Sequence, residues 1–267
     1  MSIVPESSTR RDIGLVGWQI RYEQRAFWRN RGRGIFTFAF PIMFLVIFAS
    51  LDKGQTLSTR GGIPYDDFFV PGILAYGVIA TTFINLAMST AILRDQGVLK
   101  RMQGTPLPRW AYVAARIGSS VLTMAAMSAL VIVLGVAIWG VKLRVEALPA
   151  LIVTLALGTA AFTTLGIGMT RFIPNAESGP VVLNLIVLPL TFISNIWFPT
   201  DTLPKALKTI ADIFPIKALA DGLQFVFDPR NHGSGFDGSA LRTLLIWTAI
   251  GIWLMIKFLR KPAGDVV

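Results

Sequence analysis

Cysteine is absent from the 267-residue chain, and histidine occurs once, as His232. Without cysteine the chain cannot form a disulfide, a thiolate metal site or a cysteine nucleophile. A single histidine excludes a histidine metal cluster and a histidine-dependent catalytic triad built within the chain. We therefore expect no metal site, and we expect His232 to lie on the surface of a turn-rich loop.

Charge is also scarce, and it is missing from six long apolar stretches. Charged residues make up 15% of the chain and hydrophobic residues 53%, and the mean hydropathy is +0.61. A membrane-spanning helix needs about 20 largely apolar residues. The stretches that approach or meet this length are Ile35–Leu51, Phe68–Leu93, Ile117–Trp139, Leu148–Thr170, Pro180–Phe198 and Leu244–Ile256. Because no soluble core could hold six such helices, the sequence predicts an all-α integral membrane protein with six transmembrane helices.

The net charge of +10 is distributed unevenly between the two sides of the predicted membrane. When both ends of the chain are placed in the cytoplasm, most lysines and arginines fall on the inner side, as the positive-inside rule requires. The basic charge therefore indicates orientation and contact with anionic lipid, and not binding to nucleic acid. We expect a multi-pass protein of the cell (inner or plasma) membrane with both termini cytoplasmic.

Residues 1–33 are polar and basic and carry no cleavage-site pattern, so we expect the first apolar stretch to be retained as a span. Within this cytoplasmic segment, residues 12–30 predict an amphipathic helix that lies in the membrane interface. Its apolar side carries Ile13, Val16, Gly17, Ile20, Phe27 and Trp28, and its polar side Arg21, Glu23, Arg25, Arg29 and Arg31. The helix is either a membrane anchor or a lever that joins a cytoplasmic partner to the first span. Residues 34–257 then form one transmembrane domain, and residues 258–267 a cytoplasmic tail.

The connection between the second and third predicted spans, residues 94–110, is expected on the cytoplasmic side. Its first half predicts a short helix with an apolar side made by Val98, Leu99 and Met102. Gly104 and the Thr105-Pro106-Leu107-Pro108 turn end this helix, because proline lacks an amide donor and fixes φ. Such a helix is either an ordinary solvated connector or a piece that inserts into a groove on a partner.

Two motifs occur in order along the chain. The first, in the inner loop, consists of Gly97, Leu99, Thr105-Pro106 and Arg109. The second follows the fifth predicted span and consists of Trp197-Phe198-Pro199, Leu203-Pro204 and Phe214-Pro215, followed by Ala218–Phe225. Together they resemble ABC-2 type permeases, and within that family the permeases of daunorubicin resistance and nodulation-factor export, and the resemblance covers essentially the whole chain in order. The family often has Glu followed by Lys-Gly at the start of the inner loop, where this chain has Arg94-Asp95-Gln96-Gly97. The resemblance assigns to Asp95 the place of the family's acidic residue in this loop.

The resemblance implies a fold like that of type V ABC exporters, with an outer re-entrant helical hairpin at residues 199–239 between spans five and six. Within this segment, Leu203–Ile213 and Ile216–Phe227 predict two helices that are too short to span and are separated at Phe214-Pro215. It implies the permease subunit of an ATP-binding-cassette exporter, in which two permease chains, identical or homologous, sit on two separate ATPase subunits. ATP and Mg²⁺ would be used by those partners and not bound by this chain. The chain itself has no Gly-x-x-x-x-Gly-Lys-Ser/Thr motif to hold nucleotide phosphates.

The resemblance also implies roles for two groups of residues. The ATPase-coupling group is Asp95, Gly97, Val98, Leu99, Met102, Thr105 and Pro106. The outer-gate group is Phe198, Pro199, Leu203, Pro204, Phe214 and Pro215. We expect no catalytic residue in this chain, because hydrolysis of ATP would take place in the partner.

Polar side chains in spans two and five are amides and hydroxyls, so an ion-coupled carrier, which places ionisable groups at depth, is disfavoured. These side chains either form hydrogen bonds between helices or line a path across the dimer for an amphiphilic or hydrophobic substrate such as a drug, lipid or glycolipid. The candidate path residues are Thr82, Phe83, Asn85, Ser89, Asn184, Leu188, Thr191, Phe192 and Asn195. In span five, Asn184, Leu188, Thr191 and Asn195 recur every three or four residues, so we expect them to share one helical face. Span four, which is rich in glycine and alanine, is expected to pack closely against its neighbours.

Two other functions are alternatives to the exporter subunit. A membrane-embedded lipid-modifying enzyme would need a catalytic acid or base, and the clustered carboxylates are Asp66 and Asp67 at the outer edge of span two, with no histidine or cysteine beside them. A non-transporting membrane scaffold needs no particular residues and stays an alternative. The exporter subunit is the leading interpretation, because the two loop motifs resemble ABC-2 type permeases.

Overall fold

A computed structural model describes residues 9–51, 56–57, 62–98, 101, 109–231 and 233–260. The helices are α1 Thr9–Arg29, α2 Arg31–Leu51, α3 Tyr65–Ile79, the π-helical turn η2 Ala80–Ile84, α4 Asn85–Asp95, α6 Arg109–Trp139, α7 Leu148–Met169, α8 Gly179–Phe192, α9 Lys205–Ile213, α10 Pro215–Phe227 and α11 Gly238–Arg260. The 3₁₀ turns of the described residues are η3 Val145–Ala147, η4 Thr170–Phe172 and η5 Thr200–Thr202. A two-residue antiparallel ribbon, β1 Thr56–Leu57 with β2 Ile63–Pro64, was not predicted.

Four helical stretches within the described residues are long and apolar enough to cross a membrane. They are Tyr65–Asp95, Trp110–Trp139, Val145–Phe172 and Gly238–Lys257. They correspond to the second, third, fourth and sixth predicted spans. At the first and fifth predicted spans the apolar helical stretches are shorter, Thr37–Phe48 and Gly179–Phe192.

Helix α8 ends well before the predicted end of span five at Phe198. The chain turns after Phe192, and Asn195 adopts a left-handed conformation with φ 58°. With 14 residues and a rise of 1.5 Å per residue, α8 is about 21 Å long, whereas the hydrocarbon core is roughly 30 Å thick. The predicted helical stripe of span five therefore breaks at this turn.

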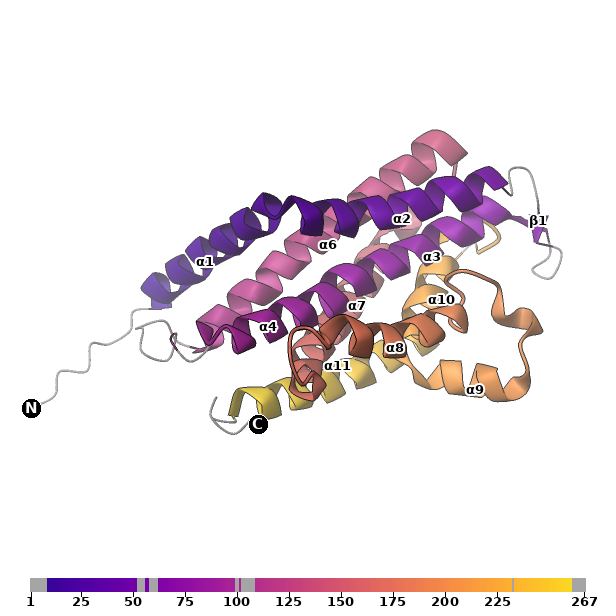
Figure 1. Ribbon diagram of the computed structural model, residues 1–267. Helices are drawn as coiled ribbons and strands as arrows, with labels where there is room; N and C mark the ends of the chain where they lie inside the picture. Colours follow the sequence, from indigo (N-terminus) through magenta and orange to yellow (C-terminus); the bar gives the residue numbers. More distant parts are fainter. Residues whose placement is uncertain are drawn as a thin grey trace, which may run out of the picture.

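The centre of the bundle is the continuous helix formed by α3, η2 and α4, which packs against α2, α6, α7 and α10. Figure 1 shows the start of α1, the end of α4 and the end of α11 at one end of the bundle, and β1 and α9 at the opposite end. Following the predicted orientation, we call these the inner end and the outer end. The 31-residue α6 and the 31-residue central helix are each about 46 Å long, so both extend beyond a hydrocarbon core.

The expectation that span four packs closely is confirmed. A Cβ atom added to Gly166 of α7 would lie 2.9 Å from the carbonyl oxygen of Phe83, and one added to Gly168 would lie 2.6 Å from Cβ of Leu254. Helix α7 therefore lies close to the π-helical turn of the central helix on one side and to α11 on the other, and neither contact leaves room for a side chain.

The outer segment contains two short helices separated at Phe214-Pro215, as predicted, but they differ in burial. Helix α10 packs against α3, α7 and α11 and belongs to the core of the bundle. Helix α9 buries Ala211 alone and leaves Leu207, Ile210 and Ile213 exposed. Helix α10 is therefore inserted among the spans, whereas α9 lies at the edge of the bundle.

Candidate functional site

The inner loop begins at a sharp turn that ends the central helix. Helix α4 stops at Asp95, and Gly97 takes a left-handed conformation with φ 68°, which glycine adopts without steric cost. Of the predicted coupling residues, Asp95, Gly97 and Val98 are described. The remaining coupling residues, Leu99, Met102, Thr105 and Pro106, lie outside the described residues.

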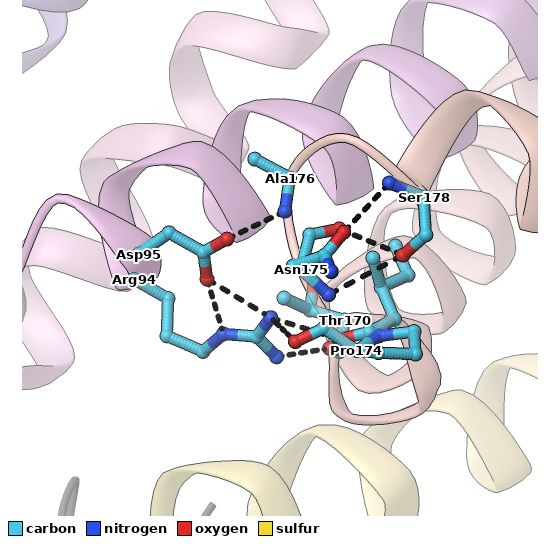
Figure 2. Close-up of polar contacts among 8 residues, drawn as sticks. Arg94, Asp95, Thr170, Pro174, Asn175, Ala176 and Ser178 are labelled. Atoms are coloured by element: carbon cyan, nitrogen blue, oxygen red, sulfur yellow. Dashed lines mark hydrogen bonds and ion pairs between the residues drawn. The ribbon is translucent and has the colours of Figure 1, made fainter. Parts of the chain in front are cut away.

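Arg94, in the last turn of α4, holds the end of α7 (Figure 2). Its Nη1 donates to the carbonyl oxygen of Thr170 at 3.0 Å, and its Nη2 donates to those of Ile173 at 2.8 Å and Pro174 at 3.0 Å. Carbonyl groups at the C-terminal end of a helix lack intrahelical donors and carry partial negative charge, so a guanidinium is a suitable partner. The Arg94 side chain is 14% exposed.

Asp95, the neighbouring residue, holds the segment that follows. Its Oδ2 accepts the backbone N–H of Ala176 at 2.5 Å, while its Oδ1 accepts from Nε of Arg94 at 3.2 Å (Figure 2). We call Arg94 and Asp95 the inner clamp, and residues Thr170–Ser178 the second inner loop. Asp95, predicted as a coupling residue, thus contacts the chain's own second inner loop. The role of Arg94 was not predicted, because its partners are backbone atoms almost 80 residues away.

A second polar cluster lies where α1 packs on α6. Arg116 of α6 is 4% exposed; it donates to the hydroxyl of Tyr112 at 3.0 Å and to Oγ of Ser89, and its Nη1 lies 3.6 Å from a carboxylate oxygen of Glu23. Glu23, which was predicted on the polar side of the N-terminal helix, faces Arg116 of α6. Nε2 of Gln24 donates to the Ser119 carbonyl oxygen at 2.7 Å and fixes α1 further.

Most of the predicted path residues of span two lie in the interior of the chain. The Thr82 hydroxyl donates to the Val78 carbonyl oxygen at 2.7 Å within its own helix, and the Ser89 hydroxyl accepts from Arg116. Phe83 is buried and packs edge-on against Phe162. In this structure these side chains support helix packing, and Asn85 is half-buried among them.

In span five the predicted path residues divide into two sets. Asn184, Leu188 and Phe192 are exposed on α8. Thr191 is buried and donates to the Leu188 carbonyl oxygen at 2.8 Å. The prediction that Asn195 continues the same helical face is wrong, because α8 has already ended.

Asn195 instead joins three pieces of the outer end. Its Oδ1 accepts from the backbone N–H of Thr200 at 2.7 Å, and its Nδ2 donates to Oδ1 of Asp221 at 2.5 Å. Gln224 of α10 donates to the Asn195 carbonyl oxygen at 2.5 Å. Asn195 is 4% exposed, so these bonds tie the end of α8 to η5 and α10.

The predicted outer-gate residues occupy different environments. Phe198 is 48% exposed, Pro199 and Leu203 are half-buried, and Pro204 is exposed at the start of α9. Phe214 stacks on Trp247 with ring centroids 5.9 Å apart, and Pro215 is buried at the start of α10. An open polar pocket of about 400 Å³ also lies at the outer end, and its charged lining residues are Asp67, Asp201, Lys208, Lys217, Asp221, Asp228, Arg230 and Asp237. The outer end therefore carries a pocket lined by charged side chains as well as exposed apolar side chains such as Phe198.

Several curated proteins are similar to this chain. The inner membrane transport permease YadH of Escherichia coli (strain K12) is 22% identical over 69% of this chain and 71% of its own length. Nodulation protein J of Rhizobium leguminosarum bv. trifolii is 30% identical over 63% of this chain and 64% of its own length. The daunorubicin resistance ABC transporter permease protein DrrB1 of Streptomyces coeruleorubidus is 24% identical over 67% and 63%.

A family match covers most of the bundle. Residues 15–227, from α1 through α10, match the ABC-2 type transporter family. The resemblance inferred from the two loop motifs is thereby confirmed, and it includes both the inner clamp and the second inner loop. The chain belongs to the ABC-2 type transporter family.

Proposed function

We propose that this chain is the membrane-spanning permease subunit of an ATP-binding-cassette exporter and is driven by separate ATPase subunits. The observation that carries the proposal is the match of residues 15–227 to the ABC-2 type transporter family. Relatives named as transport permeases support the same class. Because the chain has no phosphate-binding loop of its own, ATP and Mg²⁺ belong to the partner.

The ATPase contact is proposed at the inner loop, residues 94–110. This loop joins the central helix to α6, and each of these helices is about 46 Å long. Since the hydrocarbon core is roughly 30 Å thick, these helices are long enough for the ends that flank the loop to extend into the aqueous phase. Two ATPase subunits would engage two permease chains, with both termini of each permease in the cytoplasm of a cell membrane.

The translocation path is proposed where α8 meets a second permease chain, identical or homologous. Leu185 is 74% exposed and Val181 69%, so one face of α8 has no partner within the described part of the chain. Asn184 is exposed on the same helix. An amide facing lipid lacks hydrogen-bond partners, which favours a protein-lined or hydrated surface at this helix. Such a lining suits an amphiphilic or hydrophobic substrate, such as a drug, lipid or glycolipid.

The remaining architecture follows from this proposal. Helix α2, and α8 together with residues 193–198 that follow it, complete a six-span domain over residues 34–257, and α1 lies at the cytoplasmic interface. Helix α9, with its exposed Leu207, Ile210 and Ile213, enters the outer leaflet and forms with α10 the outer gate. An exposed apolar edge at the outer end supports this placement, because it would otherwise face water.

Purification tests the proposal. We expect the tagged chain, extracted from its native membrane in mild detergent, to retain a Walker-motif subunit in equal amount when the sample is analysed by mass spectrometry. Leu99→Glu should lower its recovery about tenfold or more, because a charge in an apolar contact costs at least about 1.4 kcal/mol. The matched control is Val145→Glu at the outer end, where Val145 is 78% exposed. Recovery of the chain alone, or equal recovery with Leu99→Glu, would contradict the proposal.

A further inference from the structure

Two adjacent side chains at the inner end join three helix ends. Arg94 and Asp95 belong to the last turn of α4, and their partners lie at the end of α7 and just before the start of α8. Figure 2 shows both side chains reaching across to the backbone of the second inner loop, Thr170–Ser178. The clamp therefore connects spans two, four and five on the side where the inner loop begins.

The geometry of the clamp is that of a rigid connection. The guanidinium is planar, and its donors point in fixed directions toward three carbonyl oxygens, so the second inner loop cannot shift without losing several charge-assisted bonds. Asp95 bonds both Arg94 and the N–H of Ala176, so the two clamp residues orient each other. The loop is also braced internally, since the backbone N–H of Ser178 donates to Oδ1 of Asn175 at 2.8 Å.

Farther from the inner end, α7 and the central helix come into contact again. Gly166 of α7 lies against the backbone carbonyls of Thr82 and Phe83 in the π-helical turn of the central helix. Helix α7 is therefore attached to the central helix at two points: the backbone contact at Gly166 and the clamp at the inner end. These contacts join the end of α4 to the end of α7 and to the segment that precedes α8.

We propose that the inner clamp transmits the motion of the ATPase contact to spans four and five, by keeping the second inner loop attached to α4 throughout the ATP cycle. This inference rests on the proposed function, because it requires an ATPase at the inner loop. Arg94 and Asp95 are positioning residues: they act through the loop they hold and do not contact the substrate.

Hydrogen–deuterium exchange of the purified complex tests the transmission. The complex is compared without nucleotide and with MgATP plus vanadate. In the unmodified chain we expect a nucleotide-dependent change in exchange at residues 95–110 and also at 170–182. In Arg94→Met the change in exchange at 95–110 should persist, whereas the change at 170–182 should fall about fivefold or more. This figure is the lower end of the coupling factors measured between sites in proteins. Arg171→Ala, which alters an exposed residue of the same loop, is the matched control and should behave as the unmodified chain.

The outcomes separate this inference from the proposed function. If Arg94→Met retains the full change at 170–182, transmission through the clamp is overturned while the exporter function stands. If the unmodified chain has no nucleotide-dependent change at 95–110, both proposals are overturned.

A covalent replacement of the clamp gives a second test, in which the linked and reduced forms of one folded variant are compared. The chain has no cysteine, so Asp95→Cys and Ala176→Cys, made together with Arg94→Met to remove the guanidinium bonds, introduce a single thiol pair in place of the 2.5 Å hydrogen bond. The oxidised, disulfide-linked form should restore the nucleotide-dependent change at 170–182, and reduction should remove it. A linked form without that change, or a reduced form that keeps it, would overturn the proposal that the clamp transmits motion by staying attached throughout the ATP cycle.

Discussion

Gly72→Val is expected to prevent accumulation of the folded protein. A Cβ atom at Gly72 of the central helix would lie 2.4 Å from the carbonyl oxygen of Ile196 and 3.3 Å from its Cα. Both sides of this contact are backbone, so no side chain can move aside. Overpacking a filled core costs about 1–3 kcal/mol and sometimes more; here we expect about 3 kcal/mol or more, a large part of a typical domain stability of about 5–15 kcal/mol. Yield of monodisperse protein and thermal unfolding in detergent measure the effect.

The matched control is Gly17→Val in α1, where an added Cβ meets no atom within 4 Å. This change introduces the same side chain into a helix without a clash. We expect its effect to be within about 1 kcal/mol, which is the range of helix-propensity differences. Equal thermal stability of the two variants would show that the segment after α8 does not lie against the central helix as described.

Glu23→Gln is expected to destabilise the protein more than Arg116→Met. Removing the carboxylate leaves the guanidinium, which is 4% exposed, buried without its counter-charge. Removing Arg116 instead leaves Glu23, whose side chain is 20% exposed and can be hydrated from its open side. Breaking a fully buried pair costs about 3–5 kcal/mol; because Glu23 is partly exposed, we expect about 2 kcal/mol for Glu23→Gln.

A double-mutant cycle measures this interaction. The double variant, with both charges removed, should be more stable than Glu23→Gln alone, because no charge is then left buried. Glu177→Gln, at an exposed acidic residue of the second inner loop, should change stability by no more than about 0.5 kcal/mol. Additive effects of the two single changes would contradict the pairing of α1 with α6 through these side chains.

Length and hydropathy predicted the features that depend on local sequence. Uninterrupted apolar stretches marked spans two, three, four and six, and Phe214-Pro215 marked the break between α9 and α10, because proline begins helices readily and interrupts them elsewhere. The glycines of span four marked its close packing. The two loop motifs, taken in order, indicated the family.

The features that sequence reasoning missed depend on backbone geometry or distant partners. Ile196–Phe198 is as apolar as the span before it, so hydropathy extended span five past the point where the backbone turns at Asn195. Arg116 was placed just outside span three, because a charge was used to mark the boundary, whereas α6 begins at Arg109. The inner clamp joins residues far apart in the sequence through backbone carbonyls, which leave no pattern in the residue types.

Cross-linking from the inner loop in native membrane vesicles tests the central claim most directly. Leu99→Cys provides one thiol in a chain that otherwise has none, and Lys205→Cys at the start of α9 provides the matched thiol at the outer end. A short bis-maleimide should join position 99, but not position 205, to a cytoplasmic protein that carries a Walker motif, as identified by mass spectrometry. A chain that is inserted in the membrane and labelled at position 99, yet forms no cross-link to an ATPase, would contradict the account of an ATP-driven permease.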